Sequence, residues 1–154
     1  MKILVLSDSH GELSNMKKAI DRENPDYVIH LGDHARDAEC LRRSYPMLPF
    51  VCVRGNCDYS DWDVPEQRML EYGGVRVLAC HGHRYGVKSG LLRYQYAAQE
   101  QQADVALFGH THCAFCQHEG GLWLINPGSC GYFRPTYAVM SIQDRKADCA
   151  IYEL

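Results

Sequence analysis

The sequence of 154 residues predicts an α/β protein in which two β-sheets pack together with helices outside them. Short apolar runs alternate with helix-like segments through the first half of the chain, and strand-like runs dominate the second half. In that second half, residues 89–102 are the one clear helix-like segment. Because strands that alternate with helices pair in parallel through right-handed crossovers, we expect parallel strands in the first half.

The first half contains strand-like runs separated by helix-like segments. Residues 2–6 (KILVL) are mostly apolar, which is typical of a strand that is buried on both faces. The segment that begins at Leu13 carries its apolar side chains at helical spacing, and Pro25 with Asp26 ends it. A strand, a helix and a strand are then expected at residues 27–32, 37–45 and 49–55.

The second half is expected to consist mainly of strands. They are residues 67–73, 74–82, 104–109, 121–126, 136–142 and 147–154. The first two meet at a Gly-Gly turn, and the last two are joined by the polar hairpin connection QDRK. The sequence shows no internal repeat, low-complexity segment or linker, so we expect one domain that spans residues 1–154.

The composition limits the classes of partner. There are 16 Lys and Arg residues against 19 Asp and Glu, for a formal charge of −3, and no basic run, so an extended nucleic-acid surface is not expected. The first residues lack the long apolar run of a signal peptide, and no run is long enough to span a bilayer. We therefore expect a cytoplasmic protein whose eight cysteines are reduced. An anionic substrate would need a local source of positive charge.

Polar residues that can bind metals follow each of five strand-like runs. The segments that follow them are SDSHG (7–11), GDH (32–34), GNCD (55–58), HGH (81–83) and GHTH (109–112). Ligands bind at the carboxyl ends of strands in α/β sheets, so these segments are expected to form one site. The candidate metal ligands are Asp8, His10, Asp33, Asn56, His81, His110 and His112.

The mixture of oxygen and imidazole donors suits Mn²⁺, Fe²⁺, Ni²⁺, Co²⁺ or Zn²⁺. This set is larger than one tetrahedral ion needs, and it fits two ions that share a bridging carboxylate. In an extended backbone, residues i and i+2 point the same way. We therefore expect Asp8 and His10 to bind one ion together, and His110 and His112 to reach a different ion each.

In this order, the motifs resemble those of the calcineurin-like metallophosphoesterase superfamily, and most of all its small YfcE-type phosphodiesterases. The resemblance runs from residue 3 to about residue 135 and includes NPGS at 126–129. It implies a four-layer α/β/β/α sandwich of two mixed β-sheets flanked by helices, without a cap domain. It also implies two ligand sets, with Asp33 in both: Asp8, His10, Asp33 and His112 for one metal, and Asp33, Asn56, His81 and His110 for the other. Mn²⁺ or Ni²⁺ is the usual productive cofactor in relatives, and Mn²⁺ is the one we expect here.

Charge balance supports hydrolysis of a phosphodiester. Two divalent ions bring four positive charges, of which Asp8 and Asp33 cancel two and a hydroxide that bridges the ions cancels one more. About one positive charge remains, enough to hold a phosphodiester monoanion without a basic patch. Asn56 is a neutral ligand and keeps the site electropositive. We therefore predict a metal-dependent phosphodiesterase in which the bridging hydroxide attacks phosphorus, with Asp33, Asn56 and His81 as its catalytic residues.

The third place of the GNCD motif departs from the family pattern. Many larger relatives carry His there, where it protonates the leaving oxygen, whereas this chain has Cys57. A thiol with a pKa of about 8.5 is a poor general acid, so diesters with good leaving groups should react far better than alkyl diesters. His83 and His34 are the alternative proton donors. The candidate substrate-binding residues are His83, Cys57 and Arg134, with Arg84, Tyr85 and Tyr132 as further pocket candidates.

The remaining polar residues of interest are interpreted as structural. His30 lies inside a strand-like run, and His118 lies beyond the motifs, where it is expected to be solvated. The CAFC segment (113–116) could indicate redox chemistry or zinc, but no second pair completes a zinc site and no helix follows to lower a thiol pKa. Asn126 and Ser129 are expected to form a tight turn near the metals.

Two other functions stay open. The first is a phosphomonoesterase or protein phosphatase of the same superfamily. The second is a non-enzymatic scaffold similar to the retromer subunit of eukaryotes, which has lost a ligand His, whereas this chain keeps every ligand position. For the enzyme we expect a small or short phosphodiester substrate and no membrane partner. Because a domain of this size leaves a shallow metal cleft, we also expect that a second copy completes the pocket, in a dimer or a tetramer.

Overall fold

The computed structural model describes residues 1–131 and 133–154, and most of its helices and strands lie where the sequence predicts them. In chain order they are β1 (Lys2–Leu6), α1 (Leu13–Glu23), β2 (Tyr27–His30), α2 (Ala35–Ser44), β3 (Phe50–Cys52), β4 (Gln67–Tyr72), β5 (Val75–Cys80), the 3₁₀ turn η1 (His83–Tyr85), α3 (Leu92–Glu100), β6 (Val105–Leu107), β7 (Phe115–Glu119), β8 (Leu122–Asn126), β9 (Thr136–Gln143) and β10 (Lys146–Glu153).

The strands form two five-stranded sheets, ordered β10-β9-β1-β2-β3 and β4-β5-β6-β8-β7. In the first sheet β1, β2 and β3 are parallel, as expected from the strand–helix alternation, while β9 and β10 are antiparallel. In the second sheet β5, β6 and β8 are parallel, and β4 and β7 pair antiparallel at the edges. Both sheets are therefore mixed, as the resemblance implies.

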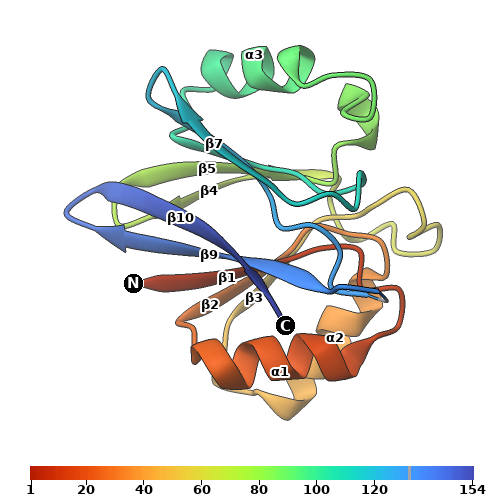
Figure 1. Cartoon of the computed structure of the whole chain (residues 1–154). Coiled ribbons are helices and arrows are strands. Elements are labelled where there is room, and N and C mark those ends of the chain that lie inside the picture. Colours follow the sequence, from red (N-terminus) through yellow and green to blue (C-terminus); the bar gives the residue numbers. More distant parts are fainter. Residues whose placement is uncertain (132) are drawn as a thin grey trace.

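The layers run helix, sheet, sheet, helix. Figure 1 shows α1 and α2 on the outer side of the first sheet and α3 on the outer side of the second. The residues of β1 explain how the layers adhere, because alternate side chains point to opposite faces of a strand. Ile3 and Val5 belong to the core between the sheets, whereas Leu4 and Leu6 pack toward α1 and α2. The four-layer sandwich is confirmed, and the apolar KILVL run has the double burial that it predicts.

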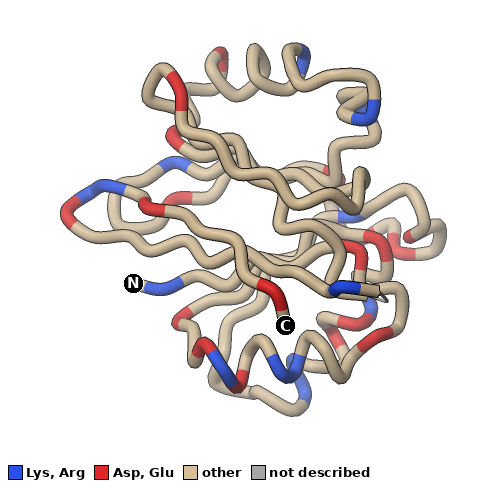
Figure 2. Tube along the Cα trace, viewed as in Figure 1, with Lys and Arg blue, Asp and Glu red and all other residues tan. Residues whose placement is uncertain are grey.

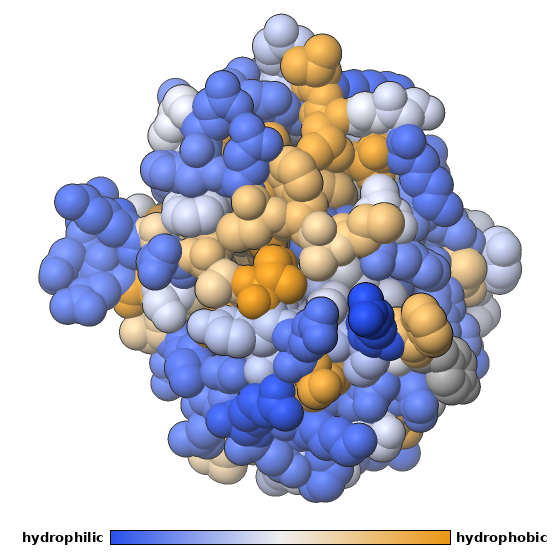
Figure 3. All heavy atoms as spheres, in the orientation of Figure 1, coloured by the Kyte–Doolittle hydropathy of each residue, from blue (hydrophilic) through white to orange (hydrophobic). Residues whose placement is uncertain are grey.

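Strand β7 was not expected from the sequence. Its residues FCQHE are mostly exposed, because β7 is an edge strand and lacks the apolar alternation of a half-buried strand. It joins β8 through Gly120 and Gly121, which both have a positive φ. The thiol of Cys116 in β7 contacts the carbonyl oxygen of Cys149 in β10, so the edge strands of the two sheets lie side by side. Figure 3 shows apolar side chains gathered in the middle of this face, with hydrophilic ones around them.

The loops that matter for function leave one edge of the sandwich. Strands β1, β2 and β3 of one sheet and β5 and β6 of the other all end there, on the right-hand side of Figure 1. Figure 2 shows acidic residues gathered at this end of the molecule. Among the helices that the structure describes, none has the length and apolar character needed to cross a membrane.

Candidate metal centre

Two carboxylates form the middle of the site. Asp8 follows β1 and is fully buried, and Asp33 follows β2 and is 3% exposed. The Oδ2 of Asp8 accepts hydrogen bonds from the Ser7 hydroxyl at 2.6 Å and from the backbone N–H of His110 at 3.1 Å. The Oδ1 of Asp8 is buried and has no hydrogen-bond partner among the described residues.

That unpartnered oxygen is informative, because a buried charge without a partner is costly. The nearest candidate partner is Nε2 of His112, 3.1 Å from Oδ1, but no hydrogen bond joins the two atoms. A carboxylate oxygen and a neutral imidazole nitrogen that face the same space can both donate lone pairs to one cation. The donor set therefore fits a divalent metal ion at this position.

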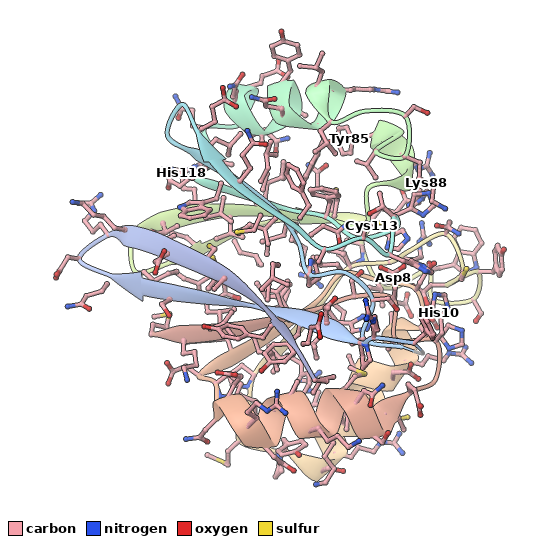
Figure 4. All side chains as sticks on the ribbon, in the orientation of Figure 1. Asp8, His10, Tyr85, Lys88, Cys113 and His118 are labelled. Carbon is pink, nitrogen blue, oxygen red and sulfur yellow. The ribbon has the colours of Figure 1, made fainter. Side chains whose placement is uncertain are left out.

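Four of the candidate ligands lie close enough together to bind one ion. One ligand atom from each of Asp8, His10, Asp33 and His112 lies within 4.8 Å of each of the others. The two Nε2 atoms of His10 and His112 are 3.4 Å apart. Figure 4 shows Asp8 and His10 at the edge where the strands end. The structure thus brings together the whole of one ligand set that the resemblance implies, which we call the first ligand group.

The other candidate ligands gather around His81, next to Asp33, and form what we call the second ligand group. Nε2 of His81 is 3.1 Å from Oδ1 of Asn56 and 3.4 Å from Oδ1 of Asp33. The His110 ring lies 5.0 Å from the His81 ring between centroids. Nδ1 of His81 is 2.8 Å from the carbonyl oxygen of Leu31 and donates to it, which leaves Nε2 free to face the carboxylates. Asp33 borders both groups, as a bridging ligand must.

Asp33 and His81 influence each other's protonation. Burial alone would raise the pKa of Asp33, but its hydrogen bond with His81 and the charge of that imidazole hold the pKa well below its usual range. Burial lowers the pKa of His81, yet the Asp33 hydrogen bond and the charges of Asp8 and Asp33 raise it overall. A cation bound at these carboxylates would compete with the His81 proton, so metal binding should release it.

The backbone at the ligands is not extended, and this corrects one expectation. Asp8, His10, His110 and His112 all have a positive φ, between 46° and 68°, so the i, i+2 argument for an extended chain is wrong at these positions. Asp33 and His34 share the left-handed conformation. Such conformations are uncommon for residues other than glycine and cluster at functional sites, where tertiary contacts hold them.

Glycines beside the ligands are needed for close packing. A Cβ on Gly109 would collide with Oγ of Ser7 and lie 2.8 Å from Oδ2 of Asp8. A Cβ on Gly55 would collide with Oδ1 of Asp33. The glycines of the GHTH and GNCD motifs therefore make room for the two carboxylates.

We expect Gly109→Ala to weaken metal binding by roughly 10- to 100-fold, the usual cost of disturbing a group that orients a ligand. The new methyl group must displace the Ser7 hydroxyl and the Asp8 carboxylate. Calorimetric titration with Mn²⁺ measures the effect. The control is Gly120→Ala in the β7–β8 turn, where the Cβ would meet no atom within 4 Å and the positive φ of 58° strains the backbone away from the ligands. Equal Mn²⁺ affinity in the folded Gly109→Ala protein and the wild type would contradict the packing argument.

Two further carboxylates, those of Asp58 and Asp37, fix the loops that carry the candidate ligands, and neither is among the residues predicted from the sequence. The buried Asp58 accepts hydrogen bonds from the N–H groups of Asp33, His34, Ala35 and Gly55, at 2.8 to 2.9 Å. It thereby ties the loop after β3 to the loop after β2. Asp37 accepts from the Ser9 hydroxyl at 2.7 Å and from the Gly11 N–H at 2.8 Å, which fixes the loop that carries His10. The signal in the sequence that could have identified Asp58 is its position as the last residue of the GNCD motif.

His30 is structural, as expected. It is fully buried, and its Nδ1 accepts a hydrogen bond from the Gly32 N–H at 3.3 Å. Its Nε2 is therefore the protonated nitrogen and donates to Oγ of Ser9 at 3.0 Å, while Ser9 donates onward to Asp37. A second proton on the ring would break the bond from Gly32. Burial lowers the pKa of His30 to about 4, against the raising effects of Asp8, Asp37 and Asp58.

This environment predicts a pH dependence of stability. Between pH 6.5 and about 4 the unfolded chain binds a proton at His30 that the folded chain does not, so the free energy of unfolding should fall as the pH falls. The loss is about 3 kcal/mol when the pH has passed the whole window. Urea unfolding of wild type and His30→Gln in EDTA at several pH values isolates this contribution. Parallel pH profiles for the two proteins would refute it.

The remaining residues expected to contact substrate include His83, Cys57, Arg134 and Tyr132. His83 lies next to the second ligand group, with its ring 5.5 Å from that of His81, and its Nδ1 is buried without a partner among the described residues. Cys57 is exposed as a residue, but its thiol is partly desolvated. This desolvation, followed by the hydrogen bond and the charge of Asp33, raises the pKa of the thiol to about 11. Arg134 is exposed in the β8–β9 loop, so its contact with substrate stays a prediction, and Tyr132 lies outside the described residues.

The CAFC segment leads into β7 rather than into a helix. All eight cysteines are free in the structure, and their reduced state in the cell stays a prediction. His118 stacks on Trp123 and lies at the opposite end of the sheets in Figure 4. Asn126 donates to the Gly109 carbonyl and the Thr111 hydroxyl, both at 2.9 Å, and Ser129 donates to the Asp8 carbonyl at 2.8 Å. These two residues therefore hold the ligand loops.

Residues 1–145 match the family model described as the calcineurin-like phosphoesterase superfamily domain. The chain belongs to that superfamily. "Probable metallophosphoesterase YsnB" of Bacillus subtilis is 36% identical, and the match covers 99% of this chain and 91% of the relative. Phosphodiesterase YfcE of Escherichia coli is 27% identical over 84% of this chain and 79% of its own length.

A crystal structure from Streptococcus pneumoniae TIGR4, of a conserved uncharacterized protein described as a predicted phosphoesterase, superposes with a TM-score of 0.82. It is 29% identical, and the match covers 99% of this chain and 88% of that one. These relatives confirm the resemblance to YfcE-like phosphoesterases. Family and relatives together support a hydrolase that acts on phosphoester bonds and requires divalent metal ions.

Proposed function

We propose that the protein is a phosphodiesterase whose first and second ligand groups hold two divalent cations, with Asp33 shared between them. The observation that carries the proposal is the convergence of two buried carboxylates with four imidazoles, where one carboxylate oxygen is buried and has no hydrogen-bond partner within residues 1–131 and 133–154. The reaction adds water across one P–O bond and gives a phosphomonoester and an alcohol. Mn²⁺ is the expected metal, and Ni²⁺, Fe²⁺, Co²⁺ and Zn²⁺ suit the same donors.

The residues divide the work. When bound, the cations would supply positive charge to the phosphate oxygens and lower the pKa of a water molecule. Asp8 and Asp33 would hold the cations, and their combined charge of −2 would leave the centre positive. The Leu31 carbonyl keeps His81 in the tautomer that presents Nε2 to the site. Asn56 adds an oxygen donor without a third negative charge, so the centre can still attract a phosphodiester monoanion.

The direct test is a metal-reconstituted assay. Protein stripped with EDTA should not hydrolyse bis-p-nitrophenyl phosphate and should regain activity with added Mn²⁺. The monoester p-nitrophenyl phosphate is the comparison substrate. A clear preference for the diester supports the proposal, a preference for the monoester favours a phosphomonoesterase, and no hydrolysis of either with any of the five metals favours a scaffold.

Assembly, location and domain extent stay predictions. A dimer or tetramer in which a second copy completes the cleft is testable by light scattering with and without Mn²⁺. The core between the sheets takes residues from both halves of the chain, including Ile3 and Val77, which supports one domain over residues 1–154. The cytoplasmic location and the small or short substrate are predictions from the composition of the sequence.

A further inference from the structure

A pocket of about 230 Å³ adjoins the metal centre. Asn56 and His83 form part of its wall, so a molecule in the pocket would reach the second ligand group. The remaining wall contains two aromatic rings, those of Tyr59 and Trp62, and two guanidinium groups, those of Arg54 and Arg84. Nothing in the metal chemistry requires these four side chains.

The aromatic rings are unusually exposed for their size. Tyr59 and Trp62 are both 78% exposed, in the loop between β3 and β4. The guanidinium carbon of Arg54 lies 4.8 Å from the centroid of the Trp62 ring, at cation–π distance. The indole is thus positioned by Arg54 while most of its surface faces solvent. Exposed apolar area of this kind, rimmed by polar groups, is typical of a ligand surface.

The loop that presents the rings is held at several points. The Asp58 carboxylate accepts hydrogen bonds from four N–H groups, as described above. Arg36 on α2 donates to Asp61 at 2.9 Å and to Ser60 at 2.8 Å. The N–H of Arg54 donates to the Pro65 carbonyl at 2.9 Å and closes the base of the loop. A surface fixed before binding loses less entropy when a ligand arrives.

The charged side chains of the pocket balance one another. Glu66 accepts hydrogen bonds from Arg54 at 2.9 Å and from both Nε and Nη2 of Arg84, at 2.8 and 2.9 Å. The Asp58 carboxylate also lines the pocket, so two guanidinium groups face two carboxylates and the wall carries no net charge. A wall without net charge suits an uncharged base, to whose ring acceptors the guanidinium groups can donate, while the phosphate would lie toward Asn56.

We propose that this pocket, the aromatic pocket, is a specificity subsite for the nucleoside part of a nucleoside phosphodiester. The base stacks on Trp62 and Tyr59 while the scissile phosphate lies at the metal centre, so the inference rests on the proposed function. The volume is below the roughly 300–1,000 Å³ of pockets for drug-sized ligands, which fits one base rather than an oligonucleotide. Stacking on aromatic side chains recognises bases of any type through their π-faces.

The kinetic test uses two substrates with the same leaving group. Thymidine 5′-(p-nitrophenyl) phosphate carries a nucleoside, and methyl p-nitrophenyl phosphate carries none. The ratio of their kcat/KM values should be well above one in the wild type and fall by about 5- to 150-fold in Trp62→Ala, the range measured for loss of one base–aromatic stack. Tyr59→Ala should lower it in the same direction. The matched control is Tyr96→Ala, whose ring is 66% exposed on α3 and outside the pocket.

A binding test does not depend on activity. Titration of the EDTA-treated protein with thymidine 5′-monophosphate should quench tryptophan fluorescence to saturation in the wild type and not in Trp62→Phe, which retains Trp123. Quenching that is equal in the two proteins overturns the subsite, as does an unchanged substrate ratio in Trp62→Ala. Failure of the wild type to hydrolyse either substrate would instead refute the proposed function. Turnover of adenylyl-adenosine, a linear diester, and of 3′,5′-cyclic AMP, a cyclic one, is compared between the wild type and Trp62→Ala. The substrate whose turnover is lost in the variant is the kind of diester that supplies the nucleoside.

Discussion

Replacing Asp33 by Asn should remove nearly all phosphodiesterase activity, with kcat/KM lower by at least about 10²- to 10³-fold, the cost of losing one preorganised charge-stabilising group. The substitution keeps the shape of the side chain and removes its charge. Asp33 lies between the two ligand groups, so both should lose affinity for their ions. Kinetics with bis-p-nitrophenyl phosphate and calorimetric titration with Mn²⁺ measure the two losses.

A matched control separates this local effect from a general loss of charge. Asp144→Asn removes one carboxylate from the exposed β9–β10 turn, where Asn tolerates the positive φ of 51°. It should leave kcat/KM and Mn²⁺ affinity unchanged. In addition, the pKa of His81 should fall in Asp33→Asn, because Asp33 is a main cause of its elevation, and NMR titration of the metal-free protein reports it. An Asp33→Asn protein that binds Mn²⁺ and turns over like the wild type would exclude Asp33 as a shared ligand.

The sequence was sufficient to predict that the candidate ligands lie together, because the relevant pattern is local. An apolar strand-like run followed by Asp, His or Asn can be read without knowing the fold, and parallel strands place their carboxyl ends at one edge. This holds for Asp8 after β1 and for His81 after β5, which the structure brings within 3.9 Å of each other, from Nε2 to Oδ1.

Other features depend on contacts between distant residues and could not be read in this way. The left-handed conformation of His110 coincides with the hydrogen bond from its N–H to Asp8, more than a hundred residues away in the chain. Asp58 acts through backbone groups of another loop, which no side-chain pattern reveals. Tyr59 and Trp62 belong to no apolar pattern of a helix or strand, and only the fold places them beside Asn56. Edge strand β7 lacks a buried face, so it has no apolar pattern to detect.

The GNCD motif has Cys57 at the place where the family resemblance implies a proton-donating His. The Cys57 thiol has its pKa raised to about 11 by burial and by Asp33, and it lies next to Asn56, whose Nδ2 is 3.4 Å from Sγ. A general acid works best when its pKa is near the operating pH. We therefore expect log kcat/KM of the wild type to fall steeply as the pKa of the leaving alcohol rises across a series of aryl and alkyl phosphodiesters.

Cys57→His should flatten that dependence, because an imidazole placed beside the leaving oxygen can protonate it at neutral pH. The gain should reach roughly 10²- to 10⁴-fold for alkyl leaving groups and be negligible for p-nitrophenolate, which needs no proton. Cys57→Ala should behave like the wild type, and Cys40→His on the exposed face of α2 should change nothing. A wild-type rate that is independent of the leaving group would mean that another group already donates the proton. His34 and His83 would then be the residues to replace, since their rings flank the two ligand groups, at 5.3 Å from His10 and 5.5 Å from His81.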